Sequence, residues 1–267
     1  MSPTALTERA VHALRAELVR HERVVVAFSG GADSAFLAWM AHDTLGPGRS
    51  VAVTAVSPSL AGRERSDCAD LAAEWGLTWR EVETNEYDDD RYRANDRDRC
   101  FWCKDALMDA VAPLADELGA VVTLGVNLDD LGDHRPGQEA ARTKGAAFPL
   151  VEAGFTKADV RTASRAVGLR TWDKPAAPCL ASRLPYGTPV TLGRLREVEV
   201  AEAALHQLGF VECRVRHYGD LARIEVPVAA LADLVARHDE VVAAVRAAGY
   251  RYVTLDLEGL RSGNLNG

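Results

Sequence analysis

Short apolar runs alternate with longer amphipathic segments through the first 125 residues of the chain. The runs predict buried strands, because a strand covered on both faces is apolar at nearly every position. Between them, apolar residues at three- and four-residue spacing predict helices. This alternation is typical of an α/β fold with a doubly wound parallel sheet. The predicted strands are 24–28, 50–57, 79–82 and 120–125, and the predicted helices are 5–20, 34–45, 62–75 and 100–118.

The pattern changes after a proline-rich stretch that ends at Pro189. Before it, a helix is predicted over 155–167, with Thr156 as its N-cap. After it, strands follow one another closely, which predicts a small α+β unit. We therefore expect an α/β domain over 1–186 and a small domain for substrate binding or oligomerisation over 187–267. The elements predicted beyond the proline-rich stretch are a helix at 192–208, strands at 212–217 and 222–226, helical segments to 248 and a strand at 251–255.

Two stretches lack a clear periodic pattern. Residues 84–99 are highly charged and contain almost no aliphatic side chains. They are too long and too polar for a simple connection, so the stretch predicts either a mobile loop or lid or a disordered surface insertion. Residues 131–149 are also expected to be irregular.

A turn of small residues joins the first predicted strand to the next helix. Ser29, Gly30 and Gly31 follow the strand, and Ser34 opens the helical pattern. Backbone N–H groups at a helix N-terminus bind anions, and paired glycines let the backbone approach a phosphate closely. Asp33 fits such a site when a divalent cation such as Mg²⁺ lies between its carboxylate and the phosphates. The turn therefore predicts a phosphate site, and the alternative is a strand-to-helix turn without a ligand.

Composition and charge narrow the possible partners. The chain has 267 residues, 48% hydrophobic content and a formal net charge of −8, which argues against a nucleic-acid-binding surface. No apolar run is long enough to cross a membrane, and the N-terminal residues lack the pattern of a secretion signal. We therefore expect a cytoplasmic protein that binds a small anionic substrate and contacts neither nucleic acid nor membrane.

Five cysteines occur, and an odd number in a chain without a secretion signal does not predict a disulfide framework. Cys68 lies on the apolar face of a predicted helix and is expected in the core. Cys100 and Cys103 form a Cys-x-x-Cys pair at a helix start, which is compatible with a redox pair, half a zinc site or two cluster ligands. With Cys179 they supply three thiolates, enough for a [4Fe–4S] cluster with one open iron. Unrelated cysteines are the alternative.

Charged residues elsewhere allow a functional and a structural interpretation. Arg214 and Arg216 alternate along a predicted strand, so both point to one face, either towards a substrate phosphate or carboxylate or towards solvent. Asp129 and Asp130 follow the fourth strand and either help to bind magnesium or shape a turn.

The Ser-Gly-Gly-x-Asp-Ser turn resembles the PP-loop of the N-type ATP pyrophosphatases, the adenine nucleotide alpha-hydrolase-like group. Further blocks extend the resemblance along nearly the whole chain to the LarE family, ATP-dependent pyridinium-biscarboxylate sulfurtransferases of nickel-pincer nucleotide biosynthesis. These blocks are Arg135-Pro136-Gly137, the segment 174–187, Arg214-Val215-Arg216, Ala222-Arg223-Ile224-Glu225 and the segment 249–257.

The resemblance implies an adenylating enzyme. In the family, a substrate carboxylate attacks the α-phosphate of ATP, pyrophosphate leaves, and a sulfur nucleophile converts the acyl adenylate to a thiocarboxylate. A carboxylate needs this activation because its own leaving group would be an oxide, and a thiolate or hydrosulfide is a matching nucleophile. The implied partners are a nucleotide carboxylate, a sulfide donor and further copies of the chain in a homo-oligomer.

The resemblance also implies roles for individual residues. Cys179, Asp33 and Arg183 take catalytic roles, and Glu202 and Asp233 match acidic family positions, although acidic residues on helices usually face solvent. Lys174 either neutralises the AMP phosphate or is a surface lysine, and Ser57 ends the strand beside which adenine sits in this fold class. The residues expected to bind the nucleotide or the substrate are Ser29, Gly30, Gly31, Asp33, Ser34, Ser57, Lys174, Ser182, Arg214 and Arg216.

Family members differ in the source of sulfur. Those with a single cysteine in the Cys179 region give up their own sulfur, whereas those with an added Cys-x-x-Cys use a cluster that carries sulfide. This chain has Cys100, Cys103 and Cys179 and therefore resembles the second type. The alternatives are a PP-loop enzyme that thiolates tRNA or another metabolite or forms an amide, and a nucleotide-binding sensor without catalysis.

Overall fold

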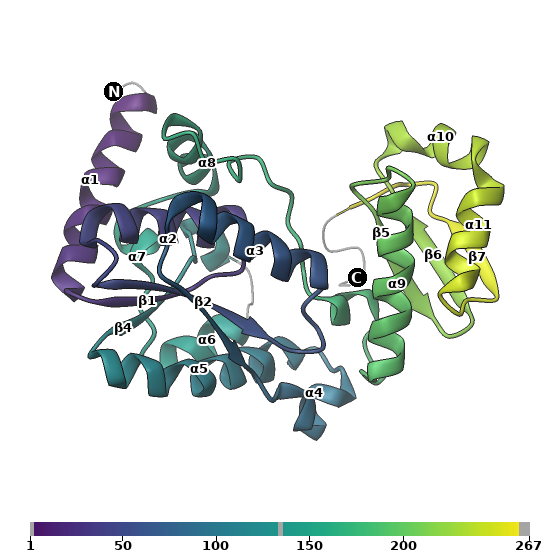
Figure 1. Cartoon of the computed structure of the whole chain (residues 1–267), viewed down its shortest axis with the longest axis horizontal. Helices are drawn as coiled ribbons and strands as arrows, with labels where there is room; N and C mark the ends of the chain where they lie inside the picture. Colours follow the sequence, from purple (N-terminus) through teal and green to yellow (C-terminus); the bar gives the residue numbers. More distant parts are fainter. Residues whose placement is uncertain (1–2, 133–135, 262–267) are drawn as a thin grey trace. The chain divides into compact units, whose positions relative to one another are not determined.

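The computed structural model describes residues 3–132 and 136–261 of the chain (Figure 1). The chain folds into two compact units, each with its own sheet and core. The first unit comprises Met1–Glu86 and Cys100–Ala177, and the second comprises Tyr87–Arg99 and Pro178–Gly267. Among the described residues, no helix combines the length and the apolar character that a membrane span requires.

A four-stranded parallel sheet lies at the centre of the first unit, with strand order β3-β2-β1-β4. All its ladders are parallel, and Val25 of β1 pairs with Val51 of β2 and with Val122 of β4. The strands form where the sequence has β-branched runs, which suit a pleated surface covered on both faces. The strands are β1 (Val24–Ala27), β2 (Ser50–Val56), β3 (Trp79–Glu83) and β4 (Val121–Leu124).

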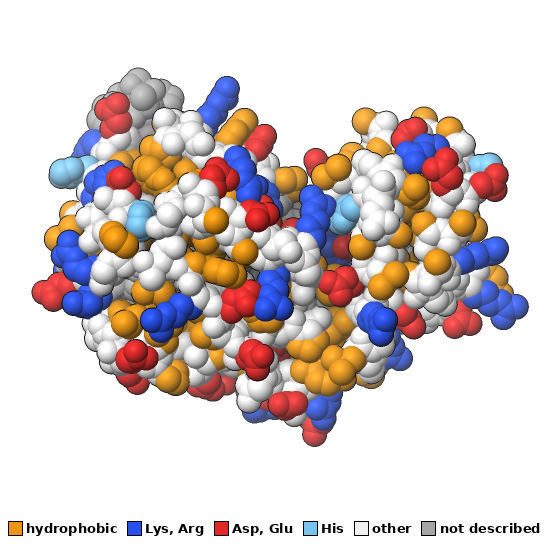
Figure 2. Space-filling model, in the orientation of Figure 1, with side chains coloured by type: hydrophobic (Ala, Val, Ile, Leu, Met, Phe, Trp, Pro, Cys, Tyr) orange, Lys and Arg blue, Asp and Glu red, His pale blue; other side chains and the backbone are white. Residues whose placement is uncertain are grey.

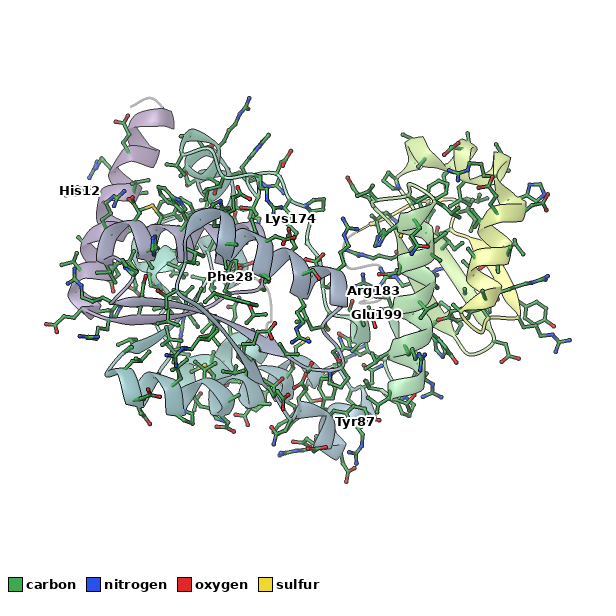
Figure 3. The ribbon with its side chains drawn as sticks, in the orientation of Figure 1. His12, Phe28, Tyr87, Lys174, Arg183 and Glu199 are labelled. Carbon is green, nitrogen blue, oxygen red and sulfur yellow. The ribbon has the colours of Figure 1, made fainter. Side chains whose placement is uncertain are left out.

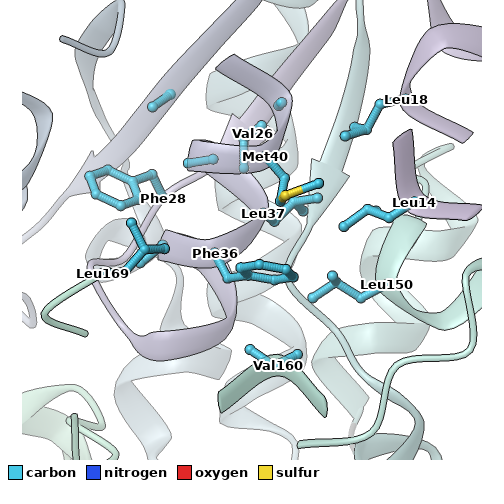
Figure 4. Close-up of a cluster of buried hydrophobic side chains, with 14 of the residues drawn as sticks. Leu14, Leu18, Val26, Phe28, Phe36, Leu37, Met40, Leu150, Val160 and Leu169 are labelled. Atoms are coloured by element: carbon cyan, nitrogen blue, oxygen red, sulfur yellow. The ribbon is translucent and has the colours of Figure 1, made fainter. Parts of the chain in front are cut away.

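Helices cover both faces of this sheet, because successive side chains of β1 point in opposite directions. Val24 and Val26 pack in a cluster with residues of α1, α2, α3 and α8, and Phe36 is fully buried there (Figure 4). Val25 packs on the other face with residues of α5, including Val111. The helices are α1 (Pro3–His21), α2 (Ala32–Leu45), α3 (Gly62–Trp75), α5 (Arg99–Leu118), α6 (Pro136–Thr143), α7 (Pro149–Glu152) and α8 (Lys157–Ala166).

The strand order confirms the predicted doubly wound α/β fold. The chain winds from β1 to β2 to β3 and then returns to the other side of β1, so β1 and β4 are neighbours at the point where the direction reverses. Ligands of such sheets bind outside the carboxyl ends of the strands at this reversal. The turn after β1 and the turn after β4 are therefore the first places to look for a site.

The second unit has a three-stranded mixed sheet of order β5-β6-β7, in which β5 and β6 are antiparallel and β6 and β7 are parallel. Its core contains Leu205 of α9, Val215 of β5 and Val245 of α11, and the predicted small α+β unit is present. The elements are η3 (Leu180–Arg183), α9 (Leu192–Gln207), β5 (Arg214–Tyr218), β6 (Leu221–Glu225), η4 (Val228–Ala230), α10 (Leu231–Ala236), α11 (His238–Ala247) and β7 (Tyr252–Leu255).

The charged segment 84–99 forms two short helices and buries side chains, so the expectation of a disordered surface insertion is wrong. Whether the segment moves as a lid stays a prediction. Tyr92 and Asn95 are buried, and the Asn95 side chain donates hydrogen bonds to the carbonyls of Pro185 (2.9 Å) and Thr188 (2.8 Å). Contacts about ninety residues apart order the segment, and its composition does not encode them. Its helices are η1 (Glu86–Asp88) and α4 (Asp90–Ala94).

These contacts also explain why the compact units differ from the domains expected from sequence. The expected boundary lay between residues 186 and 187, whereas the units divide at 177–178 and the second unit includes 87–99. Where independently folding domains begin and end stays a prediction. The expected irregular stretch 131–149 contains α6, while η2 (Leu128–Gly132) and α7 overlap its two ends. Arg135 lies outside the described residues.

Candidate functional site

The turn after β1 is held by its two serines. The Ser34 hydroxyl accepts a hydrogen bond from the Ser29 backbone N–H (3.2 Å), lies 3.0 Å from the Ser29 hydroxyl and donates to the Gly31 carbonyl (3.2 Å). Gly31 is the N-cap of α2, and no side chain caps this helix. The first N–H groups of α2 are therefore available to an anion, as the sequence predicts.

Two glycines are required for close packing around this turn. Gly30 has φ +67°, and a Cβ there would lie 3.0 Å from the Cys68 sulfur and 3.6 Å from Lys174 Nζ. A Cβ at Gly125, directly after β4, would lie 2.7 Å from the Ser34 nitrogen. The carboxyl end of β4 therefore touches the first turn of α2, which brings the turns after β1 and β4 together.

Asp33 lies in the first turn of α2, and its two carboxylate oxygens have different surroundings. Its Oδ2 forms an ion pair with Lys157, the first residue of α8. Its Oδ1 is buried and has no hydrogen-bond partner among the described residues. An unpartnered buried carboxylate oxygen is costly unless a ligand completes it, and carboxylate oxygen is a preferred ligand of Mg²⁺. Asp33 therefore fits the predicted metal-binding role.

The acidic turn after β4 is fixed by hydrogen bonds to backbone groups. Asp129 Oδ2 accepts from the Lys157 N–H (2.8 Å), and Asp130 Oδ2 accepts from the Asn127 N–H (3.2 Å). Each aspartate thus shapes the turn or holds the start of α8. At the end of β2, the Ser57 hydroxyl accepts from the Ser59 N–H (3.2 Å).

Lys174 is not a plain surface lysine, because its ammonium donates to Glu64 (2.8 Å) and Asp67 (2.6 Å) of α3 (Figure 3). Burial lowers the pKa of Lys174, but these two hydrogen-bonded carboxylates outweigh burial and hold the pKa above its ordinary value. The side chain lines a pocket of about 430 Å³ together with Arg63, Asp70 and other polar residues. Its Nζ lies beside Gly30, which supports a role at the nucleotide phosphates.

The cysteines separate into accessible and buried thiols. Cys68 and Cys213 are buried, which confirms Cys68 as a core residue, while Cys100 and Cys179 are exposed and Cys103 is intermediate. Cys100 and Cys103 lie one turn apart at the start of α5, so both side chains occupy one helix face. Within residues 3–132 and 136–261, no group of three or more His, Cys, Asp or Glu side chains has a metal-binding arrangement. Cys179 belongs to the other unit.

In the second unit, the Arg183 side chain, labelled in Figure 3, holds the backbone around Cys179. Arg183 Nη1 donates to the Cys179 carbonyl (3.2 Å) and the Ser182 hydroxyl (3.1 Å), and its other nitrogens bind both oxygens of Glu202 (2.8 and 2.9 Å). Burial lowers the pKa of Arg183, but the Glu202 carboxylate outweighs burial and raises it. Glu202 also accepts from the Val215 N–H, so it does not face solvent.

Arg214 and Arg216 are both buried on one face of β5, so the solvent-facing alternative is wrong. Arg216 donates to Glu225 (2.9 Å) and to the Ser182 carbonyl (2.9 Å), and its buried Nε has no partner among the described residues. Burial lowers the pKa of Arg214, and the charges of Arg216 and Arg183 lower it further. Positive charge is therefore concentrated beside Ser182, an arrangement suited to a phosphate or carboxylate. Asp233 is exposed in α10.

Sequence reasoning did not select Lys157 or Glu225 as site residues. The partner of Lys157 is 124 residues away in the chain, so no local pattern marks this lysine. Glu225 alternates with Arg223 in the block 222–225, and that pairing of opposite charges two residues apart was a usable signal.

On the face drawn in Figure 2, acidic and basic side chains are interspersed.

Comparison with known proteins gives matches along the whole chain. The NAD synthase family matches residues 7–98, which include the Ser29–Ser34 turn. An uncharacterised protein of Synechocystis is 45% identical over 92% of this chain and 92% of its own length. The pyridinium-3,5-bisthiocarboxylic acid mononucleotide synthase of Lactiplantibacillus plantarum is 38% identical over 98% of this chain and 95% of its own length. An uncharacterised protein of Methanocaldococcus jannaschii is 22% identical over 92% of this chain and 94% of its own length.

Proposed function

We propose that this protein transfers AMP from ATP to a carboxylate of a pyridinium mononucleotide. The proposal starts from the family: the chain belongs to the LarE family of PP-loop enzymes, which use ATP, as does the Lactiplantibacillus plantarum synthase. On the same proposal, the protein then converts the acyl adenylate to a thiocarboxylate for nickel-pincer nucleotide biosynthesis, with sulfur from a sulfide donor.

The observation that carries the proposal is the presence of two differently built anion sites. The uncapped N-terminus of α2, with Gly30 in the left-handed region, suits the phosphates of ATP. The buried Arg214 and Arg216 suit a phosphate of a second ligand, and the unpartnered Nε of Arg216 is a donor still to be satisfied. An enzyme that adenylates a nucleotide carboxylate needs a site for each of its two phosphorylated substrates.

The chemistry follows from the charges of these groups. A carboxylate oxygen attacks the α-phosphorus of ATP, the bond to the β-phosphate oxygen breaks, and pyrophosphate leaves with that electron pair. A sulfur nucleophile then attacks the acyl carbon and AMP leaves. Arg183 acts here by holding the Cys179 carbonyl and the Ser182 hydroxyl, which fixes the backbone that carries the Cys179 thiol. Lys174, beside Gly30, neutralises charge at the phosphates.

Two bound groups belong to the proposal. Mg²⁺ would bind at Asp33, whose buried Oδ1 fits a cation, and would neutralise phosphate charge. Cys100, Cys103 and Cys179 would hold a [4Fe–4S] cluster, since they are the three thiols that are not buried, and the cluster would supply an iron-bound hydrosulfide.

The test combines nucleotide and sulfur measurements on protein purified without oxygen. With ATP, a sulfide source and the pyridinium biscarboxylate mononucleotide, we expect equal amounts of AMP and pyrophosphate and a thiocarboxylate product detected by mass spectrometry. Pyrophosphate release that is independent of the carboxylate substrate, or sulfur incorporation into tRNA instead, would contradict the proposed reaction.

The cluster is tested separately by iron and acid-labile sulfide content. We expect about four irons per chain, and we expect Cys100→Ser to lose them, while Cys213→Ser, a matched change of a buried thiol, keeps them. Retention of full iron by Cys100→Ser would refute the ligand assignment. Iron-free wild-type protein that cannot be reconstituted would favour sacrifice of the Cys179 sulfur, which mass spectrometry would detect as loss of one sulfur atom.

A further inference from the structure

Arg99 is a buried cation to which the proposed reaction gives no role. It is only 5% exposed, and it is both the first residue of α5 and the residue before Cys100. Its Nη1 donates to the Ala181 carbonyl (2.8 Å) and to the Asn95 side-chain oxygen. Ala181 lies in η3, two residues after Cys179. The residue that precedes Cys100 is therefore bonded to the segment that follows Cys179.

Backbone hydrogen bonds join the same two segments elsewhere in the second unit. The Gly187 N–H donates to the Asn95 carbonyl (3.1 Å), and the Val190 N–H donates to the Arg93 carbonyl (2.8 Å). These bonds use main-chain groups, so a side-chain substitution at Arg99 does not remove them. Replacing Arg99 therefore leaves the two segments paired and removes the contact at the end from which α5 starts.

A guanidinium suits this position because its planar fork binds several acceptors in fixed directions. The fork of Arg99 binds Asn95 and Ala181 and lies over the Tyr186 ring, with 5.8 Å between the guanidinium carbon and the ring centre. A lysine would keep the charge but offer no planar fork. Hydrogen bonds from charged donors also contribute more to stability than neutral ones. The η3 segment thus fixes the orientation of Arg99.

This orientation matters for sulfur, because the thiols on the two sides of the contact, Cys100 and Cys179, are exposed. Cys100 follows Arg99 by one peptide bond, and consecutive Cα atoms are only about 3.8 Å apart. A metal site works only when its ligands are held in the right geometry by the residues behind them. Holding Arg99 on η3 therefore restricts where the Cys100 thiol can lie relative to the backbone that carries Cys179.

We propose that Arg99 is a positioning residue for sulfur transfer. Its hydrogen bond to the Ala181 carbonyl holds the start of α5 on the segment after Cys179, so that the thiols of Cys100 and Cys179 reach one shared ligand. In this role Arg99 acts through the backbone and not as a ligand of iron. The inference rests on the proposed three-cysteine cluster, but it makes a prediction for protein without iron: the two thiols lie within reach of one short linker.

The test measures how fast dibromobimane bridges Cys100 and Cys179 in iron-free protein. The parent carries Cys103→Ser, so that the linker cannot join the two cysteines of α5. Bridging is followed by fluorescence, and the joined peptides are identified by mass spectrometry. The parent is compared with Arg99→Gln, Arg99→Met and Arg99→Lys, and iodoacetamide, which reacts with one thiol at a time, reports the reactivity of each cysteine separately.

Two control variants separate positioning from general damage to the second unit. Arg93→Gln removes the same charge from the same segment, and Arg93 also donates to a carbonyl, that of Tyr87 (2.9 Å), which lies within its own segment. Val245→Ala truncates a fully buried core residue of α11 and lowers the stability of the unit without touching either segment's pairing. Urea unfolding by circular dichroism shows how much stability each variant loses.

We expect Arg99→Gln and Arg99→Met to slow bridging about tenfold, as for loss of a charged hydrogen bond, with unchanged iodoacetamide rates. Arg99→Lys should fall in between, and both controls should bridge at the parent rate. With all three cysteines present, the two neutral Arg99 variants should lose most of the iron that Arg93→Gln retains.

Three results would overturn the inference: no bridging in the parent, bridging at the parent rate in both neutral variants, or equal slowing in Val245→Ala. Wild-type protein that cannot be reconstituted with iron would refute the proposed cluster instead. The bridging comparison would then still decide the role of Arg99, because it needs no iron.

Discussion

Replacing Glu202 with glutamine removes the charge of a buried carboxylate while keeping its shape. Glu202 and Arg183 form an ion pair whose side chains are only 7% and 8% exposed. A glutamine can still accept hydrogen bonds from the Val215 N–H and from Arg183 Nε through its one oxygen, but its NH2 group cannot accept from Arg183 Nη2. The variant therefore removes the charge and one of these hydrogen bonds. Arg183, Arg214 and Arg216 would then share one remaining buried carboxylate, that of Glu225.

The expected cost follows from the burial of this pair. Removing one partner of a buried ion pair costs about 3–5 kcal/mol, because the other charge stays buried without compensation. Since glutamine keeps part of the hydrogen bonding, we expect the lower end, about 3 kcal/mol, for Glu202→Gln. Glu240→Gln is the control. It breaks a surface pair with Arg237 in the same unit, for which about 0–1 kcal/mol is expected.

The assay must report on the second unit. All five tryptophans belong to the first unit, so their fluorescence follows that unit alone. We would measure urea unfolding by far-ultraviolet circular dichroism and hydrogen exchange in the peptide that contains Val215. Inorganic phosphate should stabilise Glu202→Gln more than the wild type, because the variant has one more uncompensated positive charge beside Ser182.

Two outcomes would contradict the expected role of Glu202. If Glu202→Gln loses no more stability than Glu240→Gln, the buried pair does not compensate the arginine charge. If phosphate stabilises both proteins equally, the arginines do not form an anion site that depends on their charge balance.

Three further predictions concern single residues. Gly125→Ala should lower the free energy of unfolding by about 1–3 kcal/mol and weaken ATP binding, because its Cβ would meet the Ser34 backbone. Urea unfolding and calorimetry measure the two effects, and Gly193→Ala, with open space around the added Cβ, is the control. Burial raises the pKa of Cys68 to about 11, so iodoacetamide at neutral pH should leave Cys68 unmodified in native protein, and rapid labelling seen by mass spectrometry would contradict this. Burial lowers the pKa of His217, so the unfolded state binds more protons and stability should fall as the pH drops below about 6.5. Urea midpoints at two pH values should show less pH dependence in His217→Gln, and an unchanged dependence would exclude His217.

The architecture could be predicted because the patterns that indicate its strands, helices and turns involve only residues close together in the sequence. The β-branched run at 24–26 needs only burial on both faces to become a central strand, and Thr156 needs only the next helical turn to become an N-cap. The turn at 29–34 was also recognisable, since its glycines and serines act through backbone geometry and short-range hydrogen bonds. These parts of the fold and site agree with the predictions.

The remaining features depend on partners far along the chain. Asn95 is buried because carbonyls about ninety residues later accept its hydrogen bonds, and Glu202 is buried because Arg183 and Val215 meet it there. A polar residue carries no local mark of such a partner. The charged composition of 84–99 therefore predicted a loop, and the position of Glu202 on a helix favoured a solvent-facing side chain. Lys157 escaped notice for the same reason.

The second unit is built from two separate stretches of the chain, and this limits which segments recombination can exchange between related proteins. Residues 87–99 reach it from within the first half of the chain, and Tyr92 and Asn95 are buried as part of it. A crossover that exchanged residues 178–267 alone would leave this inserted stretch facing a foreign set of carbonyl acceptors. The C-terminal region is therefore not a transferable cassette, and a functional chimera must exchange both stretches together.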